Sequence, residues 1–207
     1  MTPSKDRVRK YWDGHAARFD AMIAPMERRF LAASRVWAAE RARGRVLEVA
    51  VGTGLNLPYY GPEARLTGVE FSDGMLQCAR DRAVQHGSPV DLVLADGARL
   101  PFADASFDAV VCTYSLCGFR DPRRAVQEML RVLAPGGDLL LVDHIGSSNP
   151  FLRAGQWLLE AATYPLQGER FTRRPRRIVE ALGVPIVETQ RLHHGIIERV
   201  HGLRSKR

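Results

Sequence analysis

Short apolar runs that alternate with helical stretches constrain the fold of this chain more than any other feature. Five runs of strand type occupy residues 45–51, 66–71, 90–95, 107–113 and 138–142. They are nearly unbroken apolar segments, which is typical of strands buried on both faces of a parallel sheet. Helical spacing between them, at 74–86 and 122–133, predicts helices that cover the sheet. The pattern therefore predicts an α/β fold.

The N-terminal segment differs from this alternation. Tyr11, Phe19 and Ile23 recur at i, i+8 and i+12 with charged residues between them, so residues 1–40 read as helices. Pro25 is expected to separate two helical pieces, because proline lacks a backbone donor.

The C-terminal part of the chain adds further elements. Pro135-Gly136-Gly137 predicts a turn between a helix and a strand. Beyond residue 150 we expect two helices and two strands, at 151–162, 173–182, 186–192 and 195–203. The whole predicts one doubly wound α/β domain over residues 1–207, with about seven strands in a mostly parallel sheet.

Composition and cysteine content exclude several classes of protein. With 45% hydrophobic and 26% charged residues, the chain can bury a core, which excludes a disordered chain. Its three cysteines cannot all pair, and none lies in a C-x-x-C motif, as is typical of a reducing compartment. The first ten residues carry charges where a signal peptide needs an apolar run, so we expect a cytoplasmic protein.

The formal net charge of +7 is unevenly distributed along the chain. Residues 1–40 hold 8 Lys and Arg against 5 Asp and Glu, and residues 151–207 hold 11 against 5. Residues 41–150, by contrast, hold 11 against 13. Basic proteins often bind nucleic acid, but here the positive excess lies only in the terminal segments, where a solvated surface explains it. We expect no nucleic-acid partner.

In a doubly wound sheet, ligands bind at the carboxyl ends of the strands. The residues that follow the five predicted strands are therefore candidate ligand contacts. They are Gly52-Thr53-Gly54, Glu70, Asp96-Gly97, Tyr114-Ser115-Leu116 and Asp143-His144.

The first of these segments is a glycine loop, which permits a tight turn and close approach of the backbone to a ligand. A dinucleotide-binding loop would carry a third glycine where Leu57 stands, and a phosphate-binding P-loop would need Gly-Lys-Ser/Thr. Neither pattern is met. The loop therefore favours a ligand with an adenosine-like half but no pyrophosphate.

Two acidic residues suit such a ligand. Glu70, eighteen residues after Gly52, suits a carboxylate that accepts hydrogen bonds from the ribose hydroxyls. Asp96 suits an adenine amino group, with Gly97 and Ala98 supplying backbone groups beside it. The structural alternatives are a solvated strand end for Glu70 and a turn or helix cap for Asp96.

Five ordered motifs resemble those of class I S-adenosylmethionine-dependent methyltransferases. They are LEVAVGTG at 47–54, GVEFSDGM at 68–75, ADG at 95–97, LPFADASFD at 100–108 and LAPGG at 133–137. The resemblance implies S-adenosylmethionine as cofactor and divides the chain into three parts. These are a helical cap at 1–40, a cofactor-binding core at 41–150, and acceptor-side helices with the last two strands at 151–207.

Other segments resemble particular groups within this family. YWDGHAARFD at 11–20 resembles the cofactor-covering helix of quinone-biosynthesis C-methyltransferases. VVCTYSLC at 110–117, with Asp143-His144 and Thr172-Arg173, is similar to animal thiol S-methyltransferase-like proteins and their bacterial relatives. The bacterial phosphatidylethanolamine N-methyltransferases are a third similar group.

The resemblance also implies a role for each strand-end segment. The glycine loop with Asn56 would hold the methionine part, Glu70 the ribose and Asp96 the adenine. Phe71 and Met75 would pack on the adenine faces, although core packing also explains them. The full set of predicted cofactor contacts is Glu48, Ala50, Gly52, Thr53, Gly54, Asn56, Glu70, Phe71, Ser72, Met75, Asp96, Gly97, Ala98, Tyr114, Ser115 and Leu116.

Two positions depart from the family pattern. Ala50 replaces the first glycine of the usual motif, which narrows the loop. Gln167-Gly168-Glu169 stands where the animal proteins have an acidic residue, Gly and Cys, so their acceptor preference does not transfer.

A sulfonium methyl group is already activated, so the main task of the protein is to align donor and acceptor and to exclude water. His144, beside Asp143, is the best-placed candidate for a general base, and Tyr11 and His15 are weaker ones. A structural role, such as a hydrogen bond to the backbone, is the alternative for His144. No Cys, His and carboxylate cluster shows metal-ligand spacing, so no metal is expected.

The segment after residue 150 is expected to bound the methyl acceptor. Its apolar side chains predict an apolar acceptor pocket, with packing of the lid onto the sheet as the alternative; they are Phe151, Leu152, Trp157, Leu158, Leu159, Tyr164, Pro165 and Leu166. The arginines that follow suit either an anionic membrane surface or a solvated helix start; they are Arg170, Arg173, Arg174, Arg176 and Arg177.

Three functional classes follow from these observations. The first is a methyltransferase acting on a small lipophilic thiol, phenol or quinone, or amine. The second is a phospholipid N-methyltransferase working at a membrane surface. The third, an RNA methyltransferase or non-catalytic RNA binder, lacks both an appended RNA-binding module and the Asn/Asp-Pro-Pro-Tyr signature.

Overall fold

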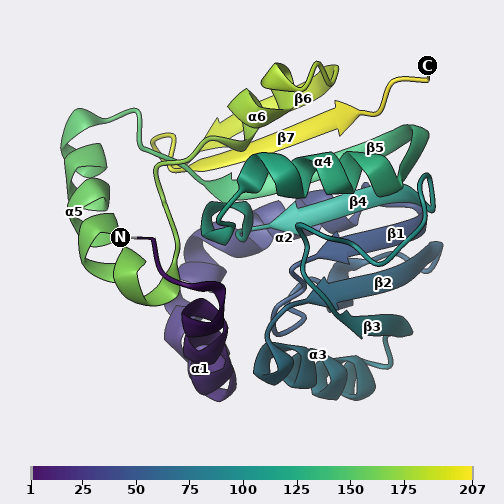
Figure 1. Ribbon diagram of the computed structural model, residues 1–207, viewed down its shortest axis with the longest axis horizontal. Helices are drawn as coiled ribbons and strands as arrows, with labels where there is room; N and C mark the ends of the chain where they lie inside the picture. The colour runs from purple at the N-terminus through teal and green to yellow at the C-terminus, as the bar shows by residue number, and fades with distance from the viewer. Residues whose placement is uncertain (1, 207) are drawn as a thin grey trace.

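The apolar runs form one seven-stranded sheet in the computed structural model, which describes residues 2–206 (Figure 1). The strands are β1 (Gly44–Val49), β2 (Ala64–Glu70), β3 (Val90–Leu94), β4 (Phe107–Thr113), β5 (Leu133–His144), β6 (Ile186–Leu192) and β7 (Ile197–Leu203). Their order is β3-β2-β1-β4-β5-β7-β6; β7 runs antiparallel to both neighbours, and the other pairs are parallel. This confirms the predicted doubly wound, mostly parallel fold.

Helices cover both faces of the sheet. They are α1 (Lys5–Met26), α2 (Ala32–Ala39), α3 (Asp73–His86), α4 (Pro122–Val132), α5 (Pro150–Gln167) and α6 (Pro175–Ala181). The apolar side chains of α2 and α3 pack on one face, and those of α4 and α6 on the other. Neighbouring strand residues split between the two layers: Val111 packs toward α2 and α3, and Cys112 packs toward α4 and α6. None of the described helices combines the length and apolarity needed to cross a bilayer.

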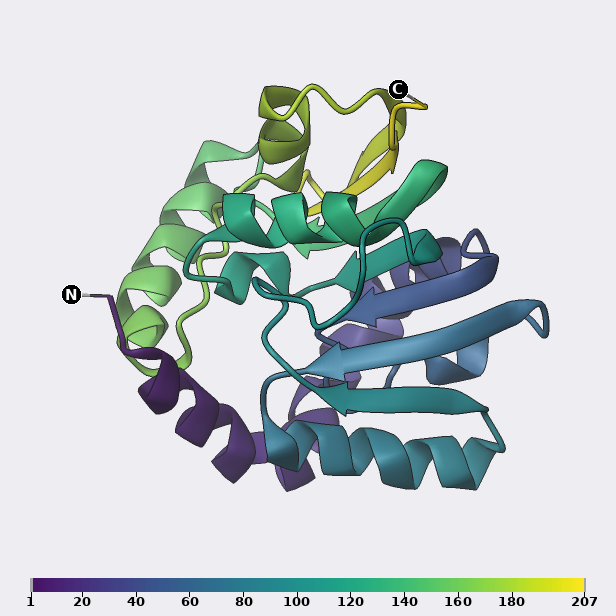
Figure 2. The same cartoon turned by 45° about the vertical axis from the view of Figure 1, so that its right-hand side comes forward.

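Helices α1 and α5 lie apart from these two layers. Figure 2 shows them as an arc that faces the carboxyl ends of β1 to β4. Pro25, which was expected to separate two helical pieces, lies inside α1, and this helix ends one residue later, at Met26. The missing N–H of Pro25 interrupts the hydrogen-bond ladder, and a π-helical segment, Glu27–Leu31, follows at once.

The turn predicted at Pro135-Gly136-Gly137 is instead an irregularity inside β5. Leu133 pairs with Phe107 and Asp138 with Ala109, so β5 has three more residues than β4 between these pairs. Gly136 takes a φ of +79° there, which a residue with a Cβ rarely adopts. Strand β5 therefore begins at Leu133 rather than at residue 138.

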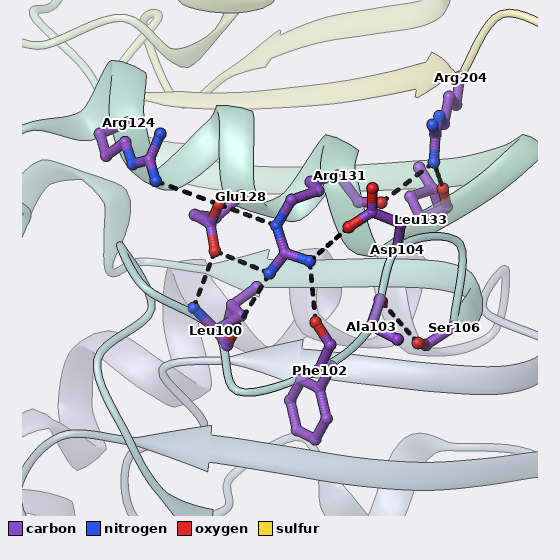
Figure 3. Close-up of polar contacts among 10 residues, drawn as sticks. All are labelled: Leu100, Phe102, Ala103, Asp104, Ser106, Arg124, Glu128, Arg131, Leu133 and Arg204. Carbon is purple, nitrogen blue, oxygen red and sulfur yellow. Dashed lines mark hydrogen bonds and ion pairs between the residues drawn. The ribbon is translucent and has the colours of Figure 1, made fainter.

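One arginine holds the loop between β3 and β4, as Figure 3 shows. Arg131 of α4 donates hydrogen bonds to the carbonyl oxygens of Leu100 (3.0 Å) and Phe102 (2.8 Å). It also bonds the carboxylates of Asp104 (2.8 Å) and Glu128 (2.9 Å), and Glu128 accepts from the Leu100 N–H at 3.0 Å. The geometry of this loop thus comes from carbonyls and carboxylates that converge on one guanidinium.

A buried polar network joins the N-terminal helices to the sheet. Arg35 of α2 is 7% exposed and bonds both carboxylate oxygens of Glu27, at 3.0 and 3.1 Å. Its guanidinium also donates to Asn56 Oδ1 (3.1 Å) and to Thr113 Oγ1 (3.0 Å) at the end of β4. Asn56 in turn donates to Glu48 Oε1 at 2.8 Å. The network fixes the loop after β1 against the loop after β4.

We expect Arg35→Ala to destabilise the protein by about 3–5 kcal/mol, because it leaves the Glu27 carboxylate, only 14% exposed, without its partner. Arg43 forms an exposed ion pair with Glu63, both side chains being 71% exposed, and Arg43→Ala should cost less than about 1 kcal/mol. Urea unfolding of the two variants measures this difference. Equal losses would contradict a structural role for the buried network.

Candidate functional site

A cavity of about 260 Å³ lies where the sequence predicted ligand contacts, between the carboxyl ends of β1 to β4 and helix α1. Ten of the predicted contacts line it: Ala50, Gly52, Glu70, Phe71, Met75, Asp96, Gly97, Ala98, Tyr114 and Ser115. Further lining residues come from strand ends, from α1 and from the segment after α5: Val69, Ala95, Gly118, Phe119, Arg120, Asp121, Lys5, Val8, Trp12, Phe19 and Glu169.

The loop after β1 takes a conformation that suits glycine at three positions. Ala50, Gly52 and Gly54 have φ values of +59°, +59° and +81°. A Cβ on Gly52 would meet no atom within 4 Å, whereas one on Gly54 would come within 2.8 Å of Leu57 and 3.2 Å of Ala79. Gly52 thus opens onto the cavity, and Gly54 permits close packing of the loop on α3. Ala50 bears the strain of a left-handed backbone, on the order of 1–2 kcal/mol.

The carboxylate of Glu70 lies at the centre of this loop region. Its Oε1 accepts from the N–H groups of Phe71 (2.9 Å) and Ser72 (3.0 Å), and its Oε2 accepts from Gly52 N–H (3.1 Å). Burial raises the pKa of Glu70, and these three donors oppose the rise. A carboxylate offers about four lone-pair sites, so Oε2 keeps a lone pair that can accept a hydrogen bond from a ligand hydroxyl.

Asp96 lies after β3 on the far side of the cavity. Its Oδ1 accepts from the Ala98 N–H at 3.0 Å, as in a turn, and its Oδ2 pairs with Lys5 Nζ of α1 at 2.6 Å. A Cβ on Gly97 would lie 2.6 Å from Val49 and 2.8 Å from Phe119, so only glycine fits that position. Asp96 therefore both stabilises a turn and lines the cavity.

Tyr114 forms part of the wall beyond β4 in a strained conformation. Its φ is +53°, which is an outlier for an aromatic residue. The hydroxyl donates to the Leu31 carbonyl at 3.0 Å, and the Arg35 guanidinium lies 4.8 Å from the ring centroid. Burial raises the pKa of Tyr114 to about 12, so the phenol stays neutral at physiological pH.

Helix α1 is attached over the cavity by two aspartates seven residues apart. Asp13 accepts from Ser72 Oγ (2.5 Å) and Gly74 N–H (3.2 Å), and Asp20 accepts from Thr53 Oγ1 (2.7 Å) and pairs with Arg82. Seven residues are two helical turns, so both carboxylates point to the sheet side. Sequence reasoning missed these anchors, although their spacing within the 11–20 motif could have shown them.

Six predicted contacts lie outside the cavity lining: Glu48, Thr53, Gly54, Asn56, Ser72 and Leu116. Thr53 and Ser72 hold the two aspartates of α1, and Leu116 is buried in the core. Glu48 accepts from Asn56 and from Tyr60 Oη (2.8 Å), and burial raises its pKa to about 7. Several of these side chains hold the loops and helix α1 around the cavity in position. Their contact with a cofactor remains a prediction.

The structure brings Cys117, Asp143 and His144 together, with one potential ligand atom of each within 4.8 Å of the others. Asp143 accepts from the backbone N–H groups of Cys117 and His144, both at 2.7 Å, so each of its oxygens already serves the fold. Burial raises the pKa of Cys117 well above its ordinary value and that of Asp143 to about 7. This cluster escaped the sequence reading because its members lie on different strand ends.

His144 lies beneath the cavity wall rather than in it. Its ring centroid is 4.9 Å from that of Tyr114 and 6.1 Å from that of Phe171. Burial, with a further contribution from Arg35, lowers its pKa to about 4. Such a ring is neutral at physiological pH and a weak proton acceptor, so a role for His144 as general base remains a prediction that this environment disfavours.

Glu169 is a cavity residue that the predicted contacts did not include. It follows Gly168, which ends α5 in the left-handed conformation (φ +75°), and its Cγ lies 3.7 Å from the Cβ position of Gly118. Burial, with a smaller contribution from Asp143, raises the pKa of Glu169 to about 8. A carboxyl that is neutral at pH 7 can donate or accept a hydrogen bond inside the cavity. Its place after a helix-ending glycine is the signal that sequence reasoning could have used.

The apolar residues of 151–166 do not form the expected pocket. Phe151, Trp157 and Leu158 are 86%, 65% and 67% exposed, and none of the three lines the cavity. Nor does the sheet cover them, so the alternative of lid packing is also wrong for these residues. Trp12, Phe19 and Phe119, from other elements, supply the apolar walls instead.

The arginines of 170–177 mostly hold the loop before α6 in place. The Arg170 guanidinium lies 4.5 Å from the Tyr164 ring, and Arg173 donates to the carbonyls of Cys117 and Phe119. Arg174 and Arg176 pair with Glu198 and Glu180 at 2.6 and 2.7 Å, which leaves Arg177 as the exposed one of the five. Four of the five thus bind protein groups, and the contact of this run with a membrane surface remains a prediction.

Comparison with known proteins agrees with this geometry. Residues 47–141 match the methyltransferase domain family. The chain is 44% identical over 103 residues to the phosphatidylethanolamine N-methyltransferase of Cereibacter sphaeroides, covering 49% of this chain and 51% of that one. It is 30% identical over 181 residues to the ubiquinone/menaquinone biosynthesis C-methyltransferase UbiE of Hahella chejuensis, covering 81% and 72%. The match thus spans about half of the first relative and nearly three quarters of the second.

A solved structure shows the same fold. The SAM-dependent methyltransferase of Thermotoga maritima superimposes with a TM-score of 0.72 and 22% identity, covering 95% of this chain and 99% of that one. The sheet order, the conformation of the glycine loop and the 30% identity to the Hahella enzyme all indicate the same family. The chain belongs to the class I S-adenosylmethionine-dependent methyltransferases.

Proposed function

We propose that this methyltransferase transfers the methyl group of S-adenosylmethionine to a small lipophilic acceptor: a thiol, a phenol or quinone, or an amine. One observation carries the proposal: the cavity joins two carboxylates that suit the cofactor to an apolar wall contributed by α1. The carboxylates, Glu70 and Asp96, belong to the core, and the wall residues Val8, Trp12 and Phe19 belong to the cap. An acceptor that met this wall would be largely apolar.

The residues present fit the cofactor. Gly52 leaves open space at its Cβ position, where the backbone would approach the methionine part. Glu70 would accept from a ribose hydroxyl and Asp96 from the adenine amino group, while Phe71 and Met75 offer flat and flexible apolar contacts to a ring. When bound, the cofactor supplies an electrophilic methyl group on a sulfonium. The protein then has to orient the two reactants and exclude water, which can contribute roughly 7–11 kcal/mol.

Helix α1 would complete the enclosure. Its Lys5 reaches across to Asp96, and Asp13 and Asp20 attach it to the loops after β2 and β1. Entry of an adenine near Asp96 requires Lys5 Nζ to share or release that carboxylate. The start of α1 is thus the part of the cap that responds to the cofactor.

Glu169 would face the acceptor end, because it lies beside Gly118 and shares the cavity with Tyr114 and Ser115. As a neutral carboxyl it would hydrogen-bond a thiol, hydroxyl or amine. Once ionised it would also attract the positive charge of the sulfonium.

Phospholipid N-methylation is the second candidate. It is favoured by the 44% identity to the Cereibacter phosphatidylethanolamine N-methyltransferase, although that match covers only 103 residues. An amine headgroup would occupy the same acceptor end, with its acyl chains outside the cavity.

Cofactor binding tests the site directly. By titration calorimetry we expect binding of S-adenosylmethionine and of S-adenosylhomocysteine, weakened at least tenfold by Glu70→Gln or Asp96→Asn, because each loses a charged acceptor. Asp91 is an exposed aspartate on β3, and Asp91→Asn serves as the matched control with unchanged affinity. Unaltered binding by both site variants would refute the proposed pose.

The acceptor class is tested with a panel of lipophilic thiols, phenols, quinones and amines, and with vesicles that contain phosphatidylethanolamine. We expect methylated product from at least one small lipophilic compound, detected by mass spectrometry with labelled cofactor. Product only from phosphatidylethanolamine would favour the second candidate over the first. Product from polar analogues alone would contradict an apolar acceptor.

The raised pKa of Glu169, about 8, predicts a pH-dependent preference for the charged cofactor. Between pH 6.5 and 9 the carboxyl ionises, so the affinity for S-adenosylmethionine relative to S-adenosylhomocysteine should rise several-fold, since only the former has a cationic sulfur. Glu169→Gln keeps the shape and removes the titration of this group, so its ratio should rise less than that of the wild type. The ratio cancels the ionisation of the amino-acid part, which both ligands share. A rise of equal size in the variant would rule out Glu169 as its source.

A further inference from the structure

Helix α5 turns its polar side toward the protein. Gln156 bonds the Ile145 carbonyl (3.0 Å) and the Ser147 N–H (2.7 Å), and Glu160 accepts from Thr172 N–H (3.1 Å) and Oγ1 (2.9 Å). Near the helix end, Gln167 accepts from the Tyr11 hydroxyl at 3.5 Å. Positions 156, 160 and 167 share one side of a helix with 3.6 residues per turn. The contacts of α5 with the body of the protein are therefore mainly polar.

The opposite side of α5 is apolar and exposed. Phe151, Leu158, Leu159 and Leu166 are 86%, 67%, 54% and 50% exposed, and no residue of this helix is buried. These four positions fall within about a third of the helix circumference. Figures 1 and 2 both show α5 at the edge of the molecule. A surface helix in water normally has the reverse arrangement, with its apolar side toward the core.

We propose that the outer face of α5, defined by Phe151, Leu158, Leu159 and Leu166, docks on a lipid bilayer and lies in the plane of its interface. The helix is too polar to cross a membrane, since none of the described helices meets that requirement. An apolar face opposite polar groups is instead the pattern of interfacial helices, whose apolar side enters the boundary between headgroups and acyl chains.

Charge complementarity identifies a lipid surface as the occupant. Residues 2–10, which lie beside the C-terminal end of α5, hold four basic residues against one acidic residue. Arg7 and Lys10, on the first turns of α1, are exposed there. Basic side chains around an apolar face complement the negative headgroups of an anionic membrane.

The docking face is continuous with the cavity, and this step rests on the proposed function. Gly168 ends α5, Glu169 lines the cavity directly after it, and Gln167 contacts α1 beside the wall residue Trp12. A bilayer held against α5 would thus lie next to the acceptor end of the site. A lipophilic acceptor dissolved in that bilayer could reach the cavity from the membrane side.

Vesicle flotation tests this face. The wild-type chain should float with vesicles of two parts phosphatidylcholine to one part phosphatidylglycerol, and less with phosphatidylcholine alone. Leu158→Glu with Leu159→Glu should reduce the bound fraction at least tenfold, because both charges enter the interface. Val84 on α3 is 82% exposed, far from α5 in the fold, and Val84→Glu is the matched control that should bind like the wild type.

Two further measurements keep the outcomes distinct. Calorimetry with S-adenosylmethionine on the Leu158/Leu159 variant should give wild-type affinity, so a loss of vesicle binding is separable from a failure of the proposed function. Sedimentation velocity of the wild type without lipid should show a monomer. The proposal would be overturned if the wild type did not float, or if the α5 variant floated equally well. A wild-type dimer that the α5 substitutions dissociate would also overturn it, in favour of a second copy of the chain as the occupant.

Discussion

The side chain of Glu70 accepts hydrogen bonds from two loops that leave neighbouring strands: from Gly52 after β1, and from Phe71 and Ser72 after β2. Most other contacts of the site depend on this arrangement. Ser72, positioned by Glu70, caps α3 through the Met75 N–H at 3.2 Å and also donates to Asp13 of α1. A single buried carboxylate thereby sets the glycine loop, the start of α3 and the position of the covering helix.

Such an arrangement concentrates acidic groups where water is scarce. Burial raises the pKa of Glu48 and Asp143 to about 7 and that of Glu169 to about 8, and it also raises that of Glu70. A carboxyl with a raised native pKa favours the folded state when protonated, so its contribution to stability declines as pH rises from its ordinary pKa to the raised value. A bound cation opposes that decline, because it stabilises the ionised carboxylates. The acidic core and a sulfonium ligand are thus complementary.

The sequence predicted the sheet well, because buried strands leave an unbroken apolar signal and their carboxyl ends are bound to meet. It also predicted ten of the residues that line the cavity, from their position near strand ends and from the resemblance to methyltransferases. It did not predict which protein groups several side chains would bond. Thr53 and Ser72 lie on the correct loops but bond the aspartates of α1, and the glycines at 136–137 form an irregularity inside a strand rather than a turn. Local pattern gives the loop but not the partner of each side chain.

Helix α5 shows the same limit most clearly. Its apolar residues predicted a pocket, because apolar side chains usually face the core of a protein. Hydrophobic periodicity shows that a helix has an apolar and a polar side, but it does not show which of them contacts the protein. Here the inward side is decided by hydrogen bonding: Gln156 and Glu160 satisfy backbone groups that would otherwise lack partners at the end of β5 and before α6. With the polar side committed inward, the leucines must face outward, at a cost in water of about 25 cal/mol per Å² of apolar surface. That cost is removed only by an apolar environment outside the chain, which is why the orientation of α5 bears on where the enzyme meets its acceptor.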